Sequence, residues 1–198
     1  MKSLCVYCGS SAGASKAYAD AARDMAKTLA ENNIALVYGG GNVGLMGVIA
    51  DEVLRLGGEV TGVIPKALMD REVGHTGLTR LHIVRDMHER KAMMAELSDG
   101  FIAMPGGIGT LEELFEVFTW SQLGMHEKPI GLLNVAGFYD GLLAFLRHVV
   151  DERFLKAKQA ALLVAEASPS SLLERFRDYH PQREDKLLDL VTAKQILP

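Results

Sequence analysis

Short apolar runs alternate with helical segments along almost the whole chain, and this alternation limits the fold more than any other feature. Each run is apolar throughout, which is typical of strands buried on both faces. Strands joined by helices form parallel sheets with right-handed crossovers. We therefore expect a single α/β domain, a Rossmann-like doubly wound parallel sheet with helices on both faces. The expected strands span residues 2–8, 34–38, 59–64, 81–84, 101–104, 130–134 and 162–164.

The segments between these runs carry helix signals. Ser15 is a suitable N-cap for the first helix, and Ser168-Pro169 suits the start of the last one. We expect residues 65–80 to form an irregular loop. The domain is predicted to cover residues 1–180, and the tail, 181–198, either docks as a small helix or frays. The expected helices before the last one span residues 15–32, 45–56, 86–98, 110–123 and 139–153.

Composition narrows the class of protein. The 198 residues are 48% hydrophobic with a formal net charge of -4, which excludes a disordered acidic chain. This charge also argues against a nucleic-acid partner, and no apolar run approaches the roughly 18 residues that span a membrane. The N-terminal apolar stretch is too short for a signal peptide. Two cysteines give no disulfide framework, so we expect a cytoplasmic protein.

One glycine-rich turn, Pro105-Gly106-Gly107-Ile108-Gly109-Thr110, lies between an expected strand and an expected helix. Its glycines allow a ligand to approach the backbone, and a helix N-terminus attracts anions. A structural alternative is a capping box, in which Thr110 caps the helix and Glu113 reaches back to its amide. A helical wheel places Glu113 opposite the apolar face, so we expect it to face a cleft. That face consists of Leu111, Leu114, Phe115 and Phe118.

Another glycine-rich turn, Gly39-Gly40-Gly41-Asn42-Val43-Gly44, follows the second expected strand and fits the pattern G-x-G-x-x-G. Either its backbone contacts a nucleotide phosphate, or its glycines only permit tight turning and helix–sheet packing. A dinucleotide site would need an acidic residue at the end of the next strand. Glu59 instead begins that strand, which counts against a nicotinamide-dependent oxidoreductase.

Arg90 falls within the apolar stripe of its expected helix, between Met87 and Met94. A guanidinium turned inward needs a carboxylate, a ligand phosphate or a wet cleft, because burying an unpaired charge is costly. The alternatives are snorkelling to the surface and a structural ion pair.

No cluster of residues has metal-ligand spacing, so no metal is expected. Cys5 and Cys8 should point to opposite faces of a strand, which favours buried structural cysteines over a redox pair.

Two motifs in this order resemble the LONELY GUY (LOG) family, Met87-His88-Glu89-Arg90-Lys91 and the segment from Pro105 to Glu113. The likeness extends over residues 8–11, 38–47, 119–124 and 128–134. Asp70 departs from it, since the family usually has Pro there. The members are cytokinin riboside 5'-monophosphate phosphoribohydrolases. The resemblance therefore implies hydrolysis of the N-glycosidic bond of an adenosine-type 5'-monophosphate, which gives the free base and ribose 5-phosphate.

The resemblance also implies roles for individual residues. Arg90 and Glu113 would form the catalytic pair, with Glu113 stabilising charge on the ribose or activating water. The substrate would be AMP or a cytokinin riboside monophosphate, with no cofactor, and the protein would form a homodimer as its relatives do. Substrate contacts would be made by Gly41, Glu72, Lys91, Gly106, Gly107, Ile108, Gly109, Thr110, Leu111, Glu112 and Thr119.

Two other functions stay open for this fold, and the weaker of them is a dinucleotide-dependent oxidoreductase. The main one is a nucleotide or cofactor carrier without turnover, and the presence of both Arg90 and Glu113 argues against it. Members of the family were often labelled lysine decarboxylases, an activity that would require pyridoxal phosphate bound to a lysine as a Schiff base. The sequence singles out no such lysine.

Overall fold

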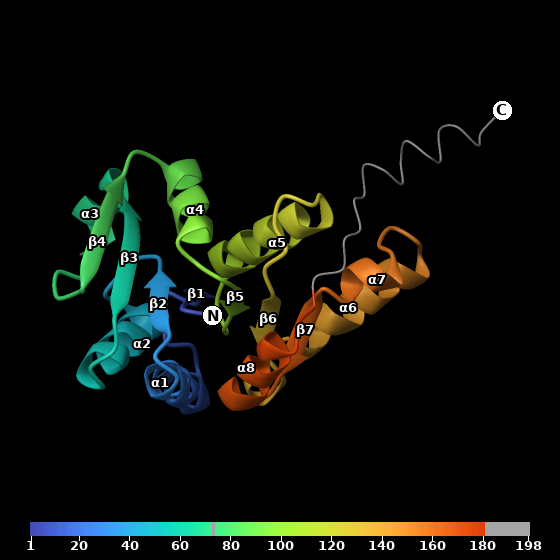
Figure 1. Cartoon of the computed structure of the whole chain (residues 1–198), viewed down its shortest axis with the longest axis horizontal. Coiled ribbons are helices and arrows are strands. Elements are labelled where there is room, and N and C mark those ends of the chain that lie inside the picture. Colours follow the sequence, from blue (N-terminus) through green and yellow to red (C-terminus); the bar gives the residue numbers. More distant parts are fainter. Residues whose placement is uncertain (73, 181–198) are drawn as a thin grey trace.

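The computed structural model describes residues 1–72 and 74–180, except for the side chains of residues 70–72. Within these residues one sheet contains seven strands in the order β4-β3-β2-β1-β5-β6-β7, all parallel (Figure 1). The prediction of a doubly wound parallel sheet is confirmed. The strands are β1 (Ser3–Tyr7), β2 (Ala35–Tyr38), β3 (Val60–Pro65), β4 (Arg80–Val84), β5 (Phe101–Ala103), β6 (Ile130–Leu133) and β7 (Leu163–Glu166).

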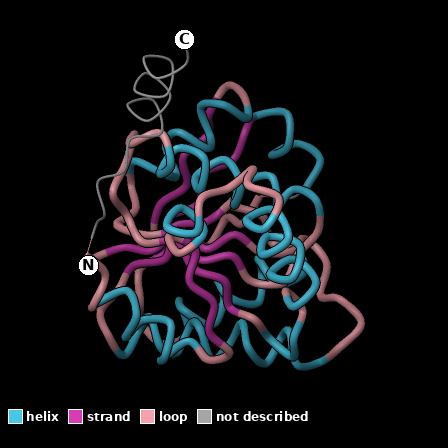
Figure 2. The backbone as a smooth tube through the Cα atoms, turned by 90° about the vertical axis from the view of Figure 1, so that its right-hand side faces the viewer, coloured by secondary structure: helices cyan, strands magenta, loops and turns pink. Residues whose placement is uncertain are grey.

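Helices connect the strands and cover both faces of the sheet (Figures 1 and 2). None of the helices in the described part of the chain is both long and apolar enough to span a membrane. The predicted tail, 181–198, lies outside the described residues. The helices are α1 (Lys16–Glu31), α2 (Gly44–Arg55), α3 (Lys66–Glu72), α4 (Met87–Glu96), α5 (Ile108–Gln122), the short 3-10 helix η1 (Val135–Gly137), α6 (Asp140–Asp151), α7 (Ala157–Ala160) and α8 (Pro169–Arg177).

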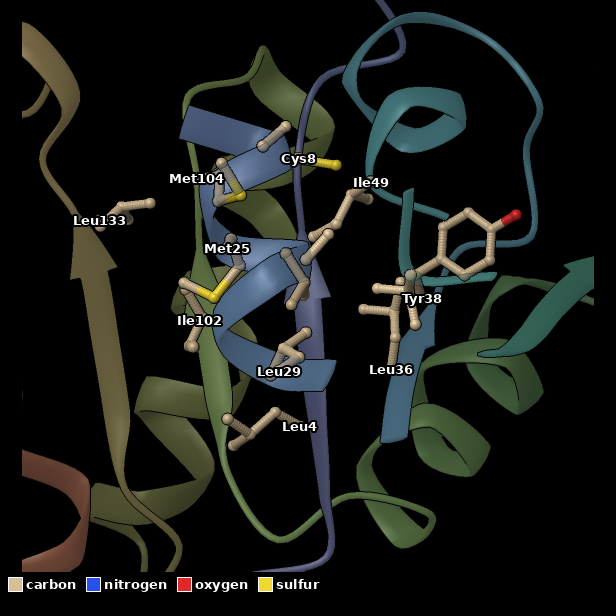
Figure 3. Packing of buried hydrophobic residues seen from close by; sticks show 14 of the residues in the cluster. Leu4, Cys8, Met25, Leu29, Leu36, Tyr38, Ile49, Ile102, Met104 and Leu133 are labelled. Atoms are coloured by element: carbon tan, nitrogen blue, oxygen red, sulfur yellow. The ribbon is translucent and has the colours of Figure 1, made fainter. Parts of the chain in front are cut away.

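Two hydrophobic clusters hold the layers together. One packs α1, α2 and α8 against one face of the sheet, and Figure 3 shows Met25 and Leu29 of α1 beside Leu4 and Ile102 of the strands. The other packs α4, α5 and α6 against the opposite face. Cys8 belongs to the first cluster and Cys5 to the second, and both are free thiols. The prediction that these cysteines are buried on opposite faces is confirmed.

Local signals fix several helix starts. The Ser15 side chain accepts a hydrogen bond from the Ala17 amide at the start of α1, as predicted for an N-cap. Ser168 caps α8 in the same way, with Pro169 in the first turn. Asp86 accepts from the Glu89 amide at 2.9 Å and so begins α4.

Two predictions about local structure were wrong. Residues 65–80 are not wholly irregular, because α3 occupies Lys66–Glu72. A helix of two turns is too short to show a clear apolar period, although most of its residues favour helices. The helix expected from Thr110 begins two residues earlier, at Ile108, with Gly107 as its N-cap. The short helix α7 was not expected at all.

Candidate active site

The order of the strands places the candidate site. The chain passes from one half of the sheet to the other after β4, and the switch point lies between β1 and β5, which pair directly. The loops that leave these two strands diverge there, and ligands of open α/β sheets bind at such switch points. A cleft of about 290 Å³ lies at this place. It is lined by Cys8, Gly9, Ser10, Met46, Leu68, Met87, Arg90, Gly107, Ile108, Gly109, Thr110, Glu112 and Glu113.

The N-terminus of α5 forms one wall of this cleft. Gly107 offers no side chain to cap the helix, so the first amides of α5 have no side-chain acceptor, and the residues of this first turn line the cleft. The capping box is therefore wrong: Thr110 is the third residue of the helix, and Glu112 and Glu113 lie in its second turn. Gly106 packs closely, since a Cβ there would lie 2.1 Å from Thr110 Oγ1. The resulting wall combines free amides with the buried Thr110 hydroxyl, which suits a phosphate.

Arg90 reaches the cleft from α4, and its side chain is only 10% exposed. Its Nε donates to the Val63 carbonyl and its Nη2 to the Gly39 carbonyl, both at 3.1 Å. Val63 lies within β3 and Gly39 directly follows β2, and the two carbonyls together fix the plane of the guanidinium. The remaining nitrogen, Nη1, lies 3.8 Å from Oε1 of Glu113. Snorkelling is thus excluded, and the guanidinium has both backbone partners and a carboxylate.

Glu113 faces this guanidinium from α5, with 12% of its side chain exposed. Burial raises the pKa of Glu113 from 4.5 to about 7, against the opposing effect of the Arg90 charge. At 3.8 Å the two groups form an ion pair beyond hydrogen-bond distance, so burial outweighs the attraction. A carboxyl group that titrates near neutral pH can exchange protons with water or substrate under physiological conditions.

Lys91 lies beside this pair but makes other contacts. Its Nζ lies 2.5 Å from Oε1 of Glu112 and 3.0 Å from Oε1 of Glu116. Burial alone would lower the pKa of Lys91, but the hydrogen bonds to Glu112 and Glu116 raise it. The ammonium therefore cross-links α4 to α5 and stays charged.

The glycine-rich turn at Gly39–Gly44 serves mainly to pack the backbone. A Cβ at Gly39 would lie 2.0 Å from Nη2 of Arg90, and one at Gly44 would lie 2.3 Å from the Ser10 carbonyl carbon. Gly41 forms an isolated antiparallel bridge with Gly74. Among the described residues, Met46 of the adjoining helix lines the cleft, but no residue of this turn does. The packing alternative thus accounts for Gly39 and Gly44, and a substrate contact by Gly41 stays a prediction.

The remaining predicted contacts divide into three groups. Gly106 adjoins the lining, and Gly107, Ile108, Gly109, Thr110 and Glu112 line the cleft. Leu111 packs against the core, and the Thr119 hydroxyl donates to the Phe115 carbonyl on the exposed side of α5. Glu72 ends α3, and its side chain is outside the description.

Sequence reasoning missed part of the lining. Gly9 and Ser10 lie there because they follow β1 directly at the switch point, and this position was the signal that could have identified them. Met46, Leu68 and Met87 come from three helices and form an apolar part of the wall. Apolar residues at helical spacing look like core residues, so the sequence offers no signal for this role.

Known proteins resemble this chain over most of its length. The family model described as "Possible lysine decarboxylase" matches residues 46–176. The cytokinin riboside 5'-monophosphate phosphoribohydrolase LOG1 of Arabidopsis thaliana is 50% identical over 183 residues, which cover 92% of this chain and 86% of that protein. The probable cytokinin riboside 5'-monophosphate phosphoribohydrolase LOGL2 of Oryza sativa is 51% identical over 181 residues, covering 91% and 74%.

Solved structures share the fold at lower identity. The molybdenum cofactor binding protein from Rippkaea orientalis has a TM-score of 0.68 and 20% identity, covering 90% of this chain and 97% of that one. The molybdenum cofactor carrier protein of Chlamydomonas reinhardtii has a TM-score of 0.69 and 17% identity, covering 90% and 99%. At this identity the two structures support the fold alone. The relatives that are about half identical to this chain show its family, and the chain belongs to the LOG family.

Proposed function

We propose that the protein is a phosphoribohydrolase that cleaves the N-glycosidic bond of AMP or a cytokinin riboside 5'-monophosphate. The products are the free base and ribose 5-phosphate. The observation that carries this proposal is the pairing of Arg90 with Glu113 at 3.8 Å inside a cleft that ends at the N-terminus of α5. Relatives that are about half identical to this chain are named for this activity.

The substrate phosphate fits the N-terminal turn of α5. The free amides and the helix dipole favour an anion there, and the Thr110 hydroxyl adds a donor. The phosphate does not react, but its binding would hold the scissile bond beside Glu113 and so lower the entropic cost of reaction. Contacts by Gly41, Glu72, Lys91, Leu111 and Thr119 complete the set proposed from the resemblance.

Glu113 would act in its ionised form. As the bond between C1' and the base nitrogen breaks, positive charge develops on the ribose, and a carboxylate beside it stabilises this charge. Water then adds to C1' and gives a proton to Glu113, while the base leaves with the bonding electrons. The departing base takes up a proton from solvent, and Glu113 returns its proton to solvent, so the carboxylate is regenerated. Arg90 would keep the Glu113 carboxylate in place, because two backbone carbonyls already fix the guanidinium.

A lysine decarboxylase would need a lysine that can form a Schiff base with pyridoxal phosphate. The lysine beside the cleft, Lys91, is held by two carboxylates that keep its amine protonated, which does not suit Schiff-base formation. The described residues around the cleft therefore do not fit this group.

Incubation with AMP tests the proposal directly. We expect release of adenine and ribose 5-phosphate in equal amounts, measured by chromatography, and a comparison with other purine and pyrimidine monophosphates defines the preferred base. Binding of AMP without release of base would contradict the hydrolase and favour a carrier.

We further propose that the protein is a homodimer that works in the cytoplasm. In support, the leucines and valines of α6 are only partly buried against the second cluster, and Phe145 on this helix is 59% exposed. The thiols of Cys5 and Cys8 are free, as in a reducing compartment. Phe145→Asp should convert a dimer into a monomer in light-scattering chromatography. An unchanged mass would place the interface elsewhere, and a monomeric wild type would contradict the dimer.

A further inference from the structure

The orientation of Arg90 depends on the turn at Gly39–Gly41, whose backbone is flexible because it consists of glycines. The Gly39 carbonyl, which accepts from Nη2 of Arg90 at 3.1 Å, is followed by Gly40 with a φ of +76°. Three successive glycines have more backbone freedom than any other tripeptide, so something outside the turn must hold this carbonyl in place.

The loop at residues 74–77 supplies that restraint. The His75 amide donates to the Gly40 carbonyl at 3.0 Å, and Gly74 pairs with Gly41 in an antiparallel bridge. Two backbone contacts thus bind the loop to residues 40 and 41, directly after the carbonyl that contacts Arg90. The position of the turn therefore depends on the position of the loop.

The imidazole of His75 fixes the loop in turn. It is buried, and both ring nitrogens are engaged: Nδ1 accepts from the Gly77 amide at 3.1 Å, and Nε2 lies 2.9 Å from Oδ1 of Asp51 on α2. Because Nδ1 accepts, the proton of the neutral ring is on Nε2 and is donated to Asp51. The ring closes the loop on itself and ties it to α2. His75 is not among the residues that line the cleft.

We infer that His75 is a positioning residue for Arg90, which acts through the loop at residues 74–77 and the turn at Gly39–Gly41 without touching the substrate. The order of contacts is Asp51, His75, Gly40 and then Gly39, whose carbonyl orients the guanidinium that faces Glu113. The consequence for catalysis rests on the proposed function, but the consequence for the geometry of Arg90 does not.

The pKa of Glu113 reports the position of the guanidinium. Arg90 lowers this pKa, so a displaced guanidinium should raise it. The other groups that act on Glu113 or feel its charge are Lys91 of α4, Glu112 and Glu116 of α5, and Cys5, Tyr7 and Cys8 on and after β1. Neither His75 nor Asp51 is among them, so a change at either residue must act through structure.

The experiment is a titration of the Glu113 carboxyl carbon by ¹³C NMR in the wild type, His75→Ala, Asp51→Ala and the control His148→Ala, whose side chain is exposed on α6. We expect His75→Ala to raise the pKa of Glu113 by about one unit and Asp51→Ala by less, with no change in His148→Ala. Removal of the negative charge of Asp51 would by itself lower the pKa, so a rise cannot come from that charge.

The second part of the experiment measures the rate of base release and the affinity for ribose 5-phosphate. In His75→Ala the kcat for base release should fall at least about tenfold while the affinity for ribose 5-phosphate stays unchanged, because the N-terminus of α5 is untouched. A folded His75→Ala with an unshifted Glu113 overturns the inference. If that variant does not fold, the direction of the shift in Asp51→Ala decides. A shift in a protein that releases no base supports the positioning role and contradicts only the proposed hydrolase.

Discussion

The two glycine-rich turns both follow a strand and precede a helix, but their glycines have different surroundings. At Gly39 and Gly44 a Cβ would collide with Arg90 or with the backbone of Ser10, so these glycines are required by the protein itself. At Gly107 and Gly109 a Cβ would meet nothing within 4 Å. Packing does not explain the second pair, and we propose that these glycines leave space for a ligand. On this proposal, the same residue type marks a structural contact in one turn and a binding surface in the other.

The sharpest test of the structural turn is Gly39→Ala. The added methyl group would overlap Nη2 of Arg90 and push the guanidinium away from Glu113. We expect kcat/KM for AMP to fall roughly 100-fold and the free energy of unfolding to drop by about 1–3 kcal/mol. Gly141→Ala on α6 is the matched control, because its Cβ would meet nothing within 4 Å and its activity should be unchanged. Wild-type kinetics in Gly39→Ala would show that Arg90 does not need this carbonyl.

The contrasting test is Gly109→Ala in the binding turn. The methyl group would protrude into the cleft without touching the protein, so the melting temperature should stay the same or rise, as for glycine replaced within a helix. We expect KM for AMP to rise about tenfold because the methyl group occupies the space of the phosphate, measured by initial rates of base release. A loss of stability with normal KM would remove the distinction between the two turns.

The pH dependence of kcat/KM gives a smaller but specific effect. Burial raises the pKa of Glu113 to about 7, so the active carboxylate forms only as pH rises through that value. Activity should therefore increase from pH 6 to pH 8, values that bracket about 7. Glu112→Gln removes a neighbouring negative charge and should move this rise toward lower pH. A rise that is unaffected by Glu112→Gln would belong to the substrate phosphate instead.

The same raised pKa affects stability. Between the pKa of Glu113 in the unfolded chain, near 4.5, and its value of about 7 in the fold, the folded state binds more protons. The contribution of this group is therefore most favourable at low pH and is lost as pH rises through about 7. Glu113→Gln should melt at a higher temperature than the wild type at pH 8, so any loss of activity in this variant cannot be attributed to unfolding.

The fold was predictable from the sequence because buried parallel strands leave continuous apolar runs, and these survive small errors at element ends. The inward position of Arg90 was predictable because a charge interrupted an apolar stripe. Its partners were not, since the carbonyls of Gly39 and Val63 lie 51 and 27 residues away and carry no side-chain signal. The start of α5 was misplaced because Thr110 and Glu113 fit a capping box by spacing alone.

The central claim is that Glu113 and Arg90 act on a nucleotide whose phosphate lies at the N-terminus of α5. Glu113→Gln tests it most directly, by base release from AMP and ribose 5-phosphate binding measured on the same sample. We predict that base release falls at least about 100-fold while ribose 5-phosphate binds as in the wild type. Release of adenine at the wild-type rate would contradict the claim.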